Sequence, residues 1–122
     1  MNAINKAIQV AKKSTFRYQI GAVLLKHGKV LSTGFNSMRH QSKFKTTHYE
    51  GSYHAEVSCI LNAIRASSVE SLKGCTMVVV RVRNSGELGL ALPCKSCYDI
   101  IQKMGIKKVL FSTNDGFSEV RV

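Results

Sequence analysis

Acidic residues are scarce in this chain. Seven Asp and Glu stand against 18 Lys and Arg, which gives a formal net charge of +11. Such an excess of positive charge attracts phosphate groups, whether they belong to free nucleotides or to nucleic acid. A solvated basic surface without a dedicated ligand is the plain alternative. The charge therefore favours an anionic substrate but does not identify it.

The chain also lacks an apolar run of membrane-spanning length, and its first residues lack the charged-then-apolar layout of a secretory signal. Polar residues, namely Asn2, Asn5 and Lys6, interrupt that first segment. We therefore expect a cytoplasmic protein with no membrane partner. A length of 122 residues with 44% hydrophobic residues predicts a single domain, residues 1–122, with its own core.

Cysteine is limited to four residues. In a small secreted chain they would predict disulfides, but nothing indicates secretion, so Cys94-x-x-Cys97 indicates metal or redox chemistry. A thioredoxin-like redox pair is the competing interpretation. The upstream His54-Ala55-Glu56 argues against it, because a redox pair needs no such partner. We expect Cys59 and Cys75 to be small core residues rather than ligands.

Hydrophobic periodicity predicts the elements of the fold. Apolar residues at helical spacing predict an amphipathic helix from Asn2 to about Thr15. Two β-rich runs, 18–26 and 29–35, predict a hairpin around His27-Gly28. Further along, we expect a helix at 54–65, a strand at 76–82 that is buried on both faces, a loop at 84–92, a helix opened by Pro93 and ended by Gly105, and strands at 107–112 and 117–122.

This order of elements predicts an α/β fold with three layers, α/β/α, around a mixed five-stranded sheet. Asn114-Asp115-Gly116 is a strong tight-turn signal, so the last two strands should pair antiparallel. Between the first hairpin and the second helix, residues 36–53 are polar, basic and without periodicity. A loop of that length is usually functional or disordered. Its positive residues, Arg39, Lys43 and Lys45, are candidates for binding a phosphate, with a solvated loop as the alternative.

A split pattern carries the chemistry. His54 and Glu56 lie two residues apart, and Pro93-Cys94-Lys95-Ser96-Cys97 follows further along the chain. One imidazole and two thiolates are three zinc ligands, and three protein ligands leave a fourth position open for water, as in catalytic zinc sites. Cys94 and Cys97 share one face of a helix. Both halves of the pattern are expected at helix starts, where the dipole and free N–H groups favour thiolate and bound hydroxide.

Zinc lowers the pKa of its bound water towards neutrality and so supplies a nucleophile. Glu56 is then close enough to pass the proton of that water to a ring nitrogen and to a departing amine. The expected reaction is hydrolysis at a C–N bond of a cyclic amidine, which releases ammonia. The arrangement H-x-E…P-C-x-x-C is the known signature of zinc deaminases.

With these residues the chain resembles the zinc-dependent cytidine/deoxycytidylate deaminase superfamily across nearly its whole length. Other matching segments are 21–25 (GAVLL), 28–36 (GKVLSTGFN), 74–76 (GCT) and 104–109 (MGIKKV). The resemblance implies a cytidine deaminase-like fold and a homo-oligomer, a dimer or tetramer, in which neighbouring subunits build the site mouth. The implied site has zinc on His54, Cys94 and Cys97, Glu56 as the proton shuttle, Asn36 bonded to the ribose or base, and the Ala55 backbone N–H on the base carbonyl.

The leading hypothesis is a zinc hydrolase that deaminates a cytosine-type base in a free nucleoside or nucleotide, such as cytidine, deoxycytidine or their phosphates. Free-nucleoside cytidine deaminases usually carry Glu two residues after the asparagine, where this chain has Met38, which disfavours an unmodified nucleoside. The alternatives are a base within nucleic acid, such as adenosine in tRNA, and another free purine or pterin base. The least favoured is a non-catalytic module with structural zinc, in which Cys59 or His48 is the fourth ligand.

Overall fold

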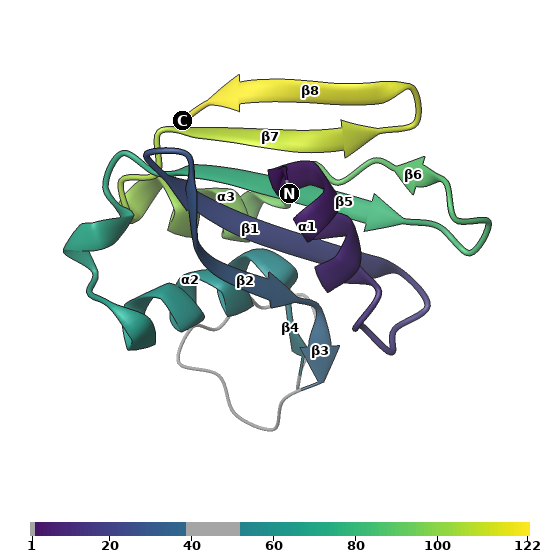
Figure 1. The fold of residues 1–122 in the computed structure, drawn as a ribbon, viewed down its shortest axis with the longest axis horizontal. Helices are drawn as coiled ribbons and strands as arrows, with labels where there is room; N and C mark the ends of the chain where they lie inside the picture. Colours follow the sequence, from purple (N-terminus) through teal and green to yellow (C-terminus); the bar gives the residue numbers. More distant parts are fainter. Residues whose placement is uncertain (1, 39–51) are drawn as a thin grey trace.

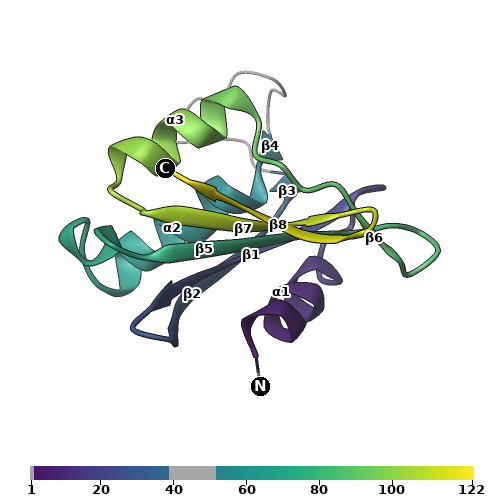
Figure 2. The ribbon, with the colours of Figure 1, turned by 90° about the horizontal axis from the view of Figure 1, so that it is seen from above.

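The computed structural model describes residues 2–38 and 52–122. A twisted sheet forms the middle layer (Figure 1). Helix α1 (Ala3–Ala11) covers one face, and α2 (Ala55–Ala66) and α3 (Lys95–Lys103) cover the other, as the view along the sheet shows (Figure 2). This arrangement confirms the predicted α/β/α layers. Among the described residues, no helix is both long and apolar enough to span a membrane.

The main sheet runs in the order β2-β1-β5-β7-β8. Its strands are β1 (Gln19–Lys26), β2 (Lys29–Phe35), β5 (Thr76–Val82), β7 (Lys108–Thr113) and β8 (Gly116–Arg121). Only β5 and β7 pair parallel along this path, because α3 crosses over between them. The mixed sheet and the antiparallel last pair are therefore confirmed.

Three short strands were not predicted. Strand β6 (Leu88–Gly89) pairs with the end of β5 as a sixth strand of the sheet, inside the segment expected to be a loop. Strands β3 (Ser37–Met38) and β4 (Ser52–Tyr53) form a two-stranded sheet of their own at the ends of the expected loop 36–53. A strand of two residues is too short to show an alternating pattern in the sequence. A 3₁₀ turn, η1 (Glu70–Leu72), links α2 to β5.

The first helix is shorter than its apolar pattern predicts. Asn2 caps it, since its side chain accepts a hydrogen bond from the Asn5 N–H at 2.8 Å. After Ala11 the helix ends in a turn, and the Ser14 hydroxyl donates to the Asn36 carbonyl at 2.8 Å. That bond turns the chain away from the helix towards β1.

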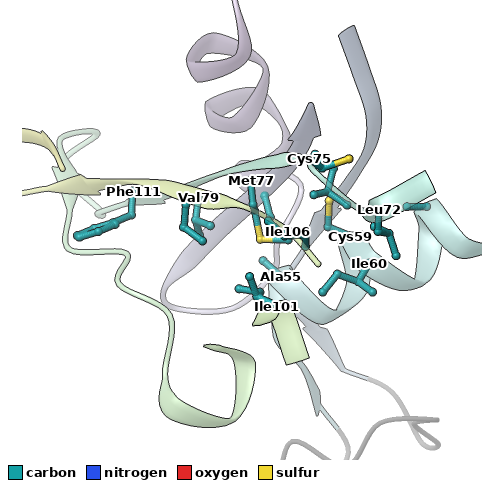
Figure 3. Close-up of a cluster of buried hydrophobic side chains, with 14 of the residues drawn as sticks. Ala55, Cys59, Ile60, Leu72, Cys75, Met77, Val79, Ile101, Ile106 and Phe111 are labelled. Carbon is teal, nitrogen blue, oxygen red and sulfur yellow. The ribbon is translucent and has the colours of Figure 1, made fainter. Parts of the chain in front are cut away.

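The core lies on both faces of the sheet, and β5 is buried on both, as predicted. The larger cluster lies between the sheet and the helix pair α2 and α3. Ala55, Cys59 and Ile60 of α2 and Ile101 of α3 face Met77, Val79 and Phe111 of the strands (Figure 3). A second cluster lies under α1. Cys59 and Cys75 are both fully buried, so the prediction that they are core residues is confirmed.

Candidate metal centre and active site

The two halves of the sequence pattern occupy equivalent places in the fold. His54 is the N-cap of α2 and Cys94 is the N-cap of α3, both with extended backbone. Their carbonyls accept the first helical bonds, from Ser58 N–H at 3.0 Å and Tyr98 N–H at 2.8 Å. Neither side chain caps its helix. Both side chains therefore remain available as ligands at a helix N-terminus.

One detail of the prediction is wrong. Pro93 does not open α3, because Cys94 is the N-cap and the helical residues begin at Lys95. Pro93 lies directly before the N-cap, where its fixed φ suits the extended chain. The thiol of Cys94 therefore belongs to the N-cap residue and not to the first helical turn.

The three predicted ligands converge. The donor atoms of His54, Cys94 and Cys97 all lie within 4.8 Å of one another. His54 Nδ1 is 3.0 Å from Cys97 Sγ and 3.6 Å from Cys94 Sγ. Zinc bonds of about 2.0–2.3 Å in a tetrahedron require donors roughly 3.5–3.8 Å apart, so the group fits zinc with only small side-chain adjustment. The donor set, one nitrogen and two sulfurs, is also one that zinc prefers.

Apolar packing holds the two helix starts together. Val57 and Leu61 of α2 form a small buried cluster with Cys97 of α3, and Ile100 packs against it. The ligands are therefore fixed by the core and not by a loop. Such support keeps metal ligands near their binding geometry before the ion arrives.

Burial raises the pKa of the Cys97 thiol, and the charges of Glu56 and Cys94 raise it further. The helix dipole alone, on which the sequence argument relied for thiolate formation, does not overcome this cost. A divalent cation would supply the missing positive charge, so thiolate formation at Cys97 would accompany metal binding.

Glu56 lies in the first turn of α2 and is only 6% exposed. Burial raises the pKa of its carboxyl group from 4.5 to about 7, and a hydrogen bond with its own backbone opposes part of that rise. It lines a cleft of about 140 Å³. A carboxyl group with a pKa near neutrality is well suited to accept and return a proton.

Sequence reasoning missed most of this cleft. Its other lining residues are Tyr18, Ile20, Arg81, Leu90, Ala91 and Leu92. One signal was available. Arg81 interrupts the apolar run of β5, and a cation inside a central strand needs a reason. The apolar members carry no comparable signal, because apolar residues on such segments are also ordinary core residues.

The two predicted substrate contacts occupy different situations. Asn36 is buried, and its side-chain amide accepts from the Ile20 N–H at 3.0 Å and donates to the Tyr18 carbonyl at 2.6 Å. It therefore holds the start of β1, and a bond to substrate stays a prediction. Ala55 is the first residue of α2, where backbone N–H groups lack helical partners. Its contact with a base also stays a prediction.

The candidate phosphate ligands Arg39, Lys43 and Lys45 lie outside the described residues, as does His48. Cys59, the other proposed fourth ligand, is not part of the donor group. Its thiol lies in the core, 3.3 Å from the Ser32 hydroxyl. A closed four-ligand site that uses Cys59 is therefore excluded.

Comparison with known proteins agrees with this geometry. Residues 1–113 match the family described as the cytidine and deoxycytidylate deaminase zinc-binding region. The chain belongs to this family. The predictions of a hydrolytic enzyme of the deaminase class and of zinc as its metal are thereby confirmed. The chain is also 32% identical over 97 residues to an uncharacterized deaminase in the luxG 3′ region of Aliivibrio fischeri, covering 75% of this chain but 56% of that protein. It thus spans about half the length of this curated relative.

Solved structures show the same fold. The dCMP deaminase of cyanophage S-TIM5 is 23% identical with a TM-score of 0.64, covering 90% of this chain and 79% of that one. The cytidine deaminase of Mycobacterium leprae is 18% identical with a TM-score of 0.63, covering 94% and 87%. A diaminohydroxyphosphoribosylaminopyrimidine deaminase/5-amino-6-(5-phosphoribosylamino)uracil reductase of Thermotoga maritima is 27% identical with a TM-score of 0.59, covering 90% and 28%. These names span several substrates, so the family does not fix the substrate.

Proposed function

We propose that this protein is a zinc-dependent hydrolytic deaminase of a cytosine-type base in a free nucleoside or nucleotide. The observation that carries the proposal is the convergence of His54, Cys94 and Cys97 at two helix starts, with the buried carboxyl group of Glu56 two residues from the histidine. A structural zinc site would give Glu56 no function. The small cleft lined by Glu56 suits a single heterocyclic ring, since clefts for larger ligands measure about 300–1,000 Å³.

When bound, zinc lowers the pKa of a coordinated water towards neutrality. His54, Cys94 and Cys97 would hold the ion, and the packing of α2 on α3 fixes their positions. Glu56 takes one proton of the attacking water at a carboxylate oxygen and delivers it to the ring nitrogen as the new C–O bond forms. It then carries the second proton of that water to the amine, so that the C–N bond breaks and ammonia leaves. The apolar walls at Ile20 and Ala91 exclude bulk water from the cleft, which strengthens these charge interactions.

Two further properties complete the proposal. The protein acts as a homo-oligomer, supported by the half-exposed apolar side chains of Leu90 and Leu92 at the cleft, which another subunit could cover. It works in the cytoplasm, supported by a site that depends on reduced Cys94 and Cys97.

The test is an ammonia-release assay of the zinc-loaded protein on cytidine, deoxycytidine and their phosphates. Turnover of at least one of them is expected. Absence of turnover on all of them, with zinc fully bound, overturns the proposal.

The net charge of +11 supports a second candidate, deamination of a base within RNA or DNA. Turnover on an oligonucleotide, together with binding that weakens steeply with salt, would favour this candidate. Turnover on the free compounds alone excludes it.

A further inference from the structure

Among the residues that the structure describes, the wall of the cleft contains one cation, Arg81, which the proposed chemistry does not use. Its guanidinium carbon lies 4.3 Å from the centre of the Tyr18 ring, and both residues line the cleft with Glu56. Tyr18 is 51% exposed, so the stacked guanidinium lies at the mouth of the cleft and not at its base.

Arg81 has no acidic partner in the part of the chain that the structure describes. The ion pairs found there join Arg83 to Glu87 and Lys108 to Glu119. The Nε atoms of Arg81 and Arg83 are both buried and make no hydrogen bond in that part of the chain, and of these two arginines Arg81 lines the cleft. A buried donor on a charged group that lacks a partner costs free energy, and a ligand that supplies an acceptor would remove that cost.

The surroundings of Arg81 hold it in place. Its backbone N–H donates to the buried Ser112 hydroxyl at 3.0 Å, and that hydroxyl donates to the Gly89 carbonyl at 2.6 Å. Gly89 of β6 is paired with Arg81. A side chain at Gly89 would meet Arg83 Cγ at 3.2 Å and Arg81 Cδ at 3.4 Å, so the glycine leaves space for both arginines to lie across β6. The ring of Tyr18 provides the other contact.

We propose that Arg81 is a specificity-determining residue that binds the phosphate next to the ribose of the substrate, and that the enzyme therefore acts on a nucleoside monophosphate in preference to the nucleoside. This inference rests on the proposed function. A guanidinium binds phosphate oxygens through two parallel N–H bonds, and stacking on Tyr18 fixes the plane of that fork. The cleft has room for the base, so the phosphate lies at its mouth, where Arg81 is.

The test compares kcat/KM for deoxycytidine and for its 5′-monophosphate in the zinc-loaded protein and in Arg81→Met. Loss of a charge-assisted bond predicts a decrease of about 10- to 100-fold for the monophosphate. The value for the nucleoside should change little. Arg83→Met is the matched control. Arg83 lies two residues from Arg81 and carries the same charge, but it already pairs with Glu87. It should leave the ratio of the two substrates unchanged.

Arg81→Lys keeps the charge without the planar fork, so it should retain part of the monophosphate preference. It also replaces Arg81→Met if that variant does not fold. Equal loss on both substrates, or no loss on the monophosphate, overturns the inference while the proposed function stands.

Equilibrium binding separates the inference from turnover. In a Glu56→Gln background, deoxycytidine monophosphate should bind more tightly than deoxycytidine, and Arg81→Met should abolish that difference. This result supports the inference even if the wild-type protein deaminates none of the compounds in the ammonia-release assay, in which case the proposed function alone fails. Equal binding of both compounds, or binding of neither, overturns the role of Arg81.

Discussion

At the scale of single residues, Cys59 illustrates how strongly the core of this protein alters a titratable group. Burial raises the pKa of its thiol to about 12, while a hydrogen bond with Ser32 opposes part of that rise. The neutral thiol is therefore the form that the folded state accommodates. In an unfolded chain the same thiol ionises near its ordinary value of 9.0.

This difference predicts a pH dependence of stability. Below pH 9.0 both states keep the proton, and the full stability is present. Between pH 9.0 and about pH 12 the unfolded chain loses the Cys59 proton and the folded chain keeps it. The free energy of unfolding therefore decreases by up to about 1.4 kcal/mol per pH unit. Cys59→Ala lacks this component, so urea denaturation across the lower half of that range should show its curve converging on the wild-type curve. Parallel curves would refute the assignment.

Ser112 is a second residue whose role the structure defines. Its hydroxyl joins Arg81 of β5 to Gly89 of β6, and it is completely buried. Ser112→Ala leaves the Gly89 carbonyl without its donor, which should lower the free energy of unfolding by about 1–3 kcal/mol in urea denaturation. Ser118→Ala, at an exposed position of the adjacent β8, is the control and should change it by less than about 0.5 kcal/mol. Equal effects of the two would exclude this role.

At the scale of elements, the site depends on how closely α2 approaches β2. A side chain at Gly34 would collide with backbone atoms of α2, the N–H nitrogen of Cys59 and the carbonyl of Ala55. Gly21 is equivalent on the other face, where a side chain would collide with the backbone of α1 at Ala7 and Ala11. Both glycines set the distance between a helix and the sheet. Of these two helices, α2 begins at a metal ligand and α1 carries none.

Gly34→Ala should therefore displace the start of α2 and lower zinc affinity by at least about tenfold, in addition to lost stability. Gly21→Ala should lose comparable stability with a much smaller change in zinc affinity. Competition with a chelator of known affinity, measured below the unfolding temperature of both variants, checks this. Equal losses of zinc affinity would show that general destabilisation is responsible.

Long elements and the metal ligands could be predicted from the sequence, because both leave local signals. The spacing of Cys94 and Cys97, the run 76–82 and the turn at 114–116 each depend on a few neighbouring residues. The cleft could not be predicted, because Tyr18, Arg81 and Leu90 meet only through pairing of β1, β5 and β6. The role of Asn36 in fixing Tyr18 also depends on contacts between distant residues.

At the scale of the whole molecule, the net charge of +11 acts on every anion that approaches. Its field should raise the encounter rate with a phosphorylated substrate and leave a neutral nucleoside unaffected. Raising NaCl from low salt to about 0.5 M should then lower kcat/KM for a monophosphate by roughly tenfold, since the Debye length becomes shorter than the protein. The value for the nucleoside should stay nearly constant. The same salt dependence for both substrates would mean that the charge serves another purpose.

The central claim is that His54, Cys94 and Cys97 hold a catalytic zinc ion and that Glu56 moves the proton. The most direct test is the rate of ammonia release by Glu56→Gln, with zinc content and circular dichroism measured on the same sample. The variant should keep wild-type zinc and fold while its rate falls by about 10²- to 10⁴-fold on the substrate that the wild-type protein turns over. A zinc-loaded, folded Glu56→Gln protein with an unchanged rate would contradict the account.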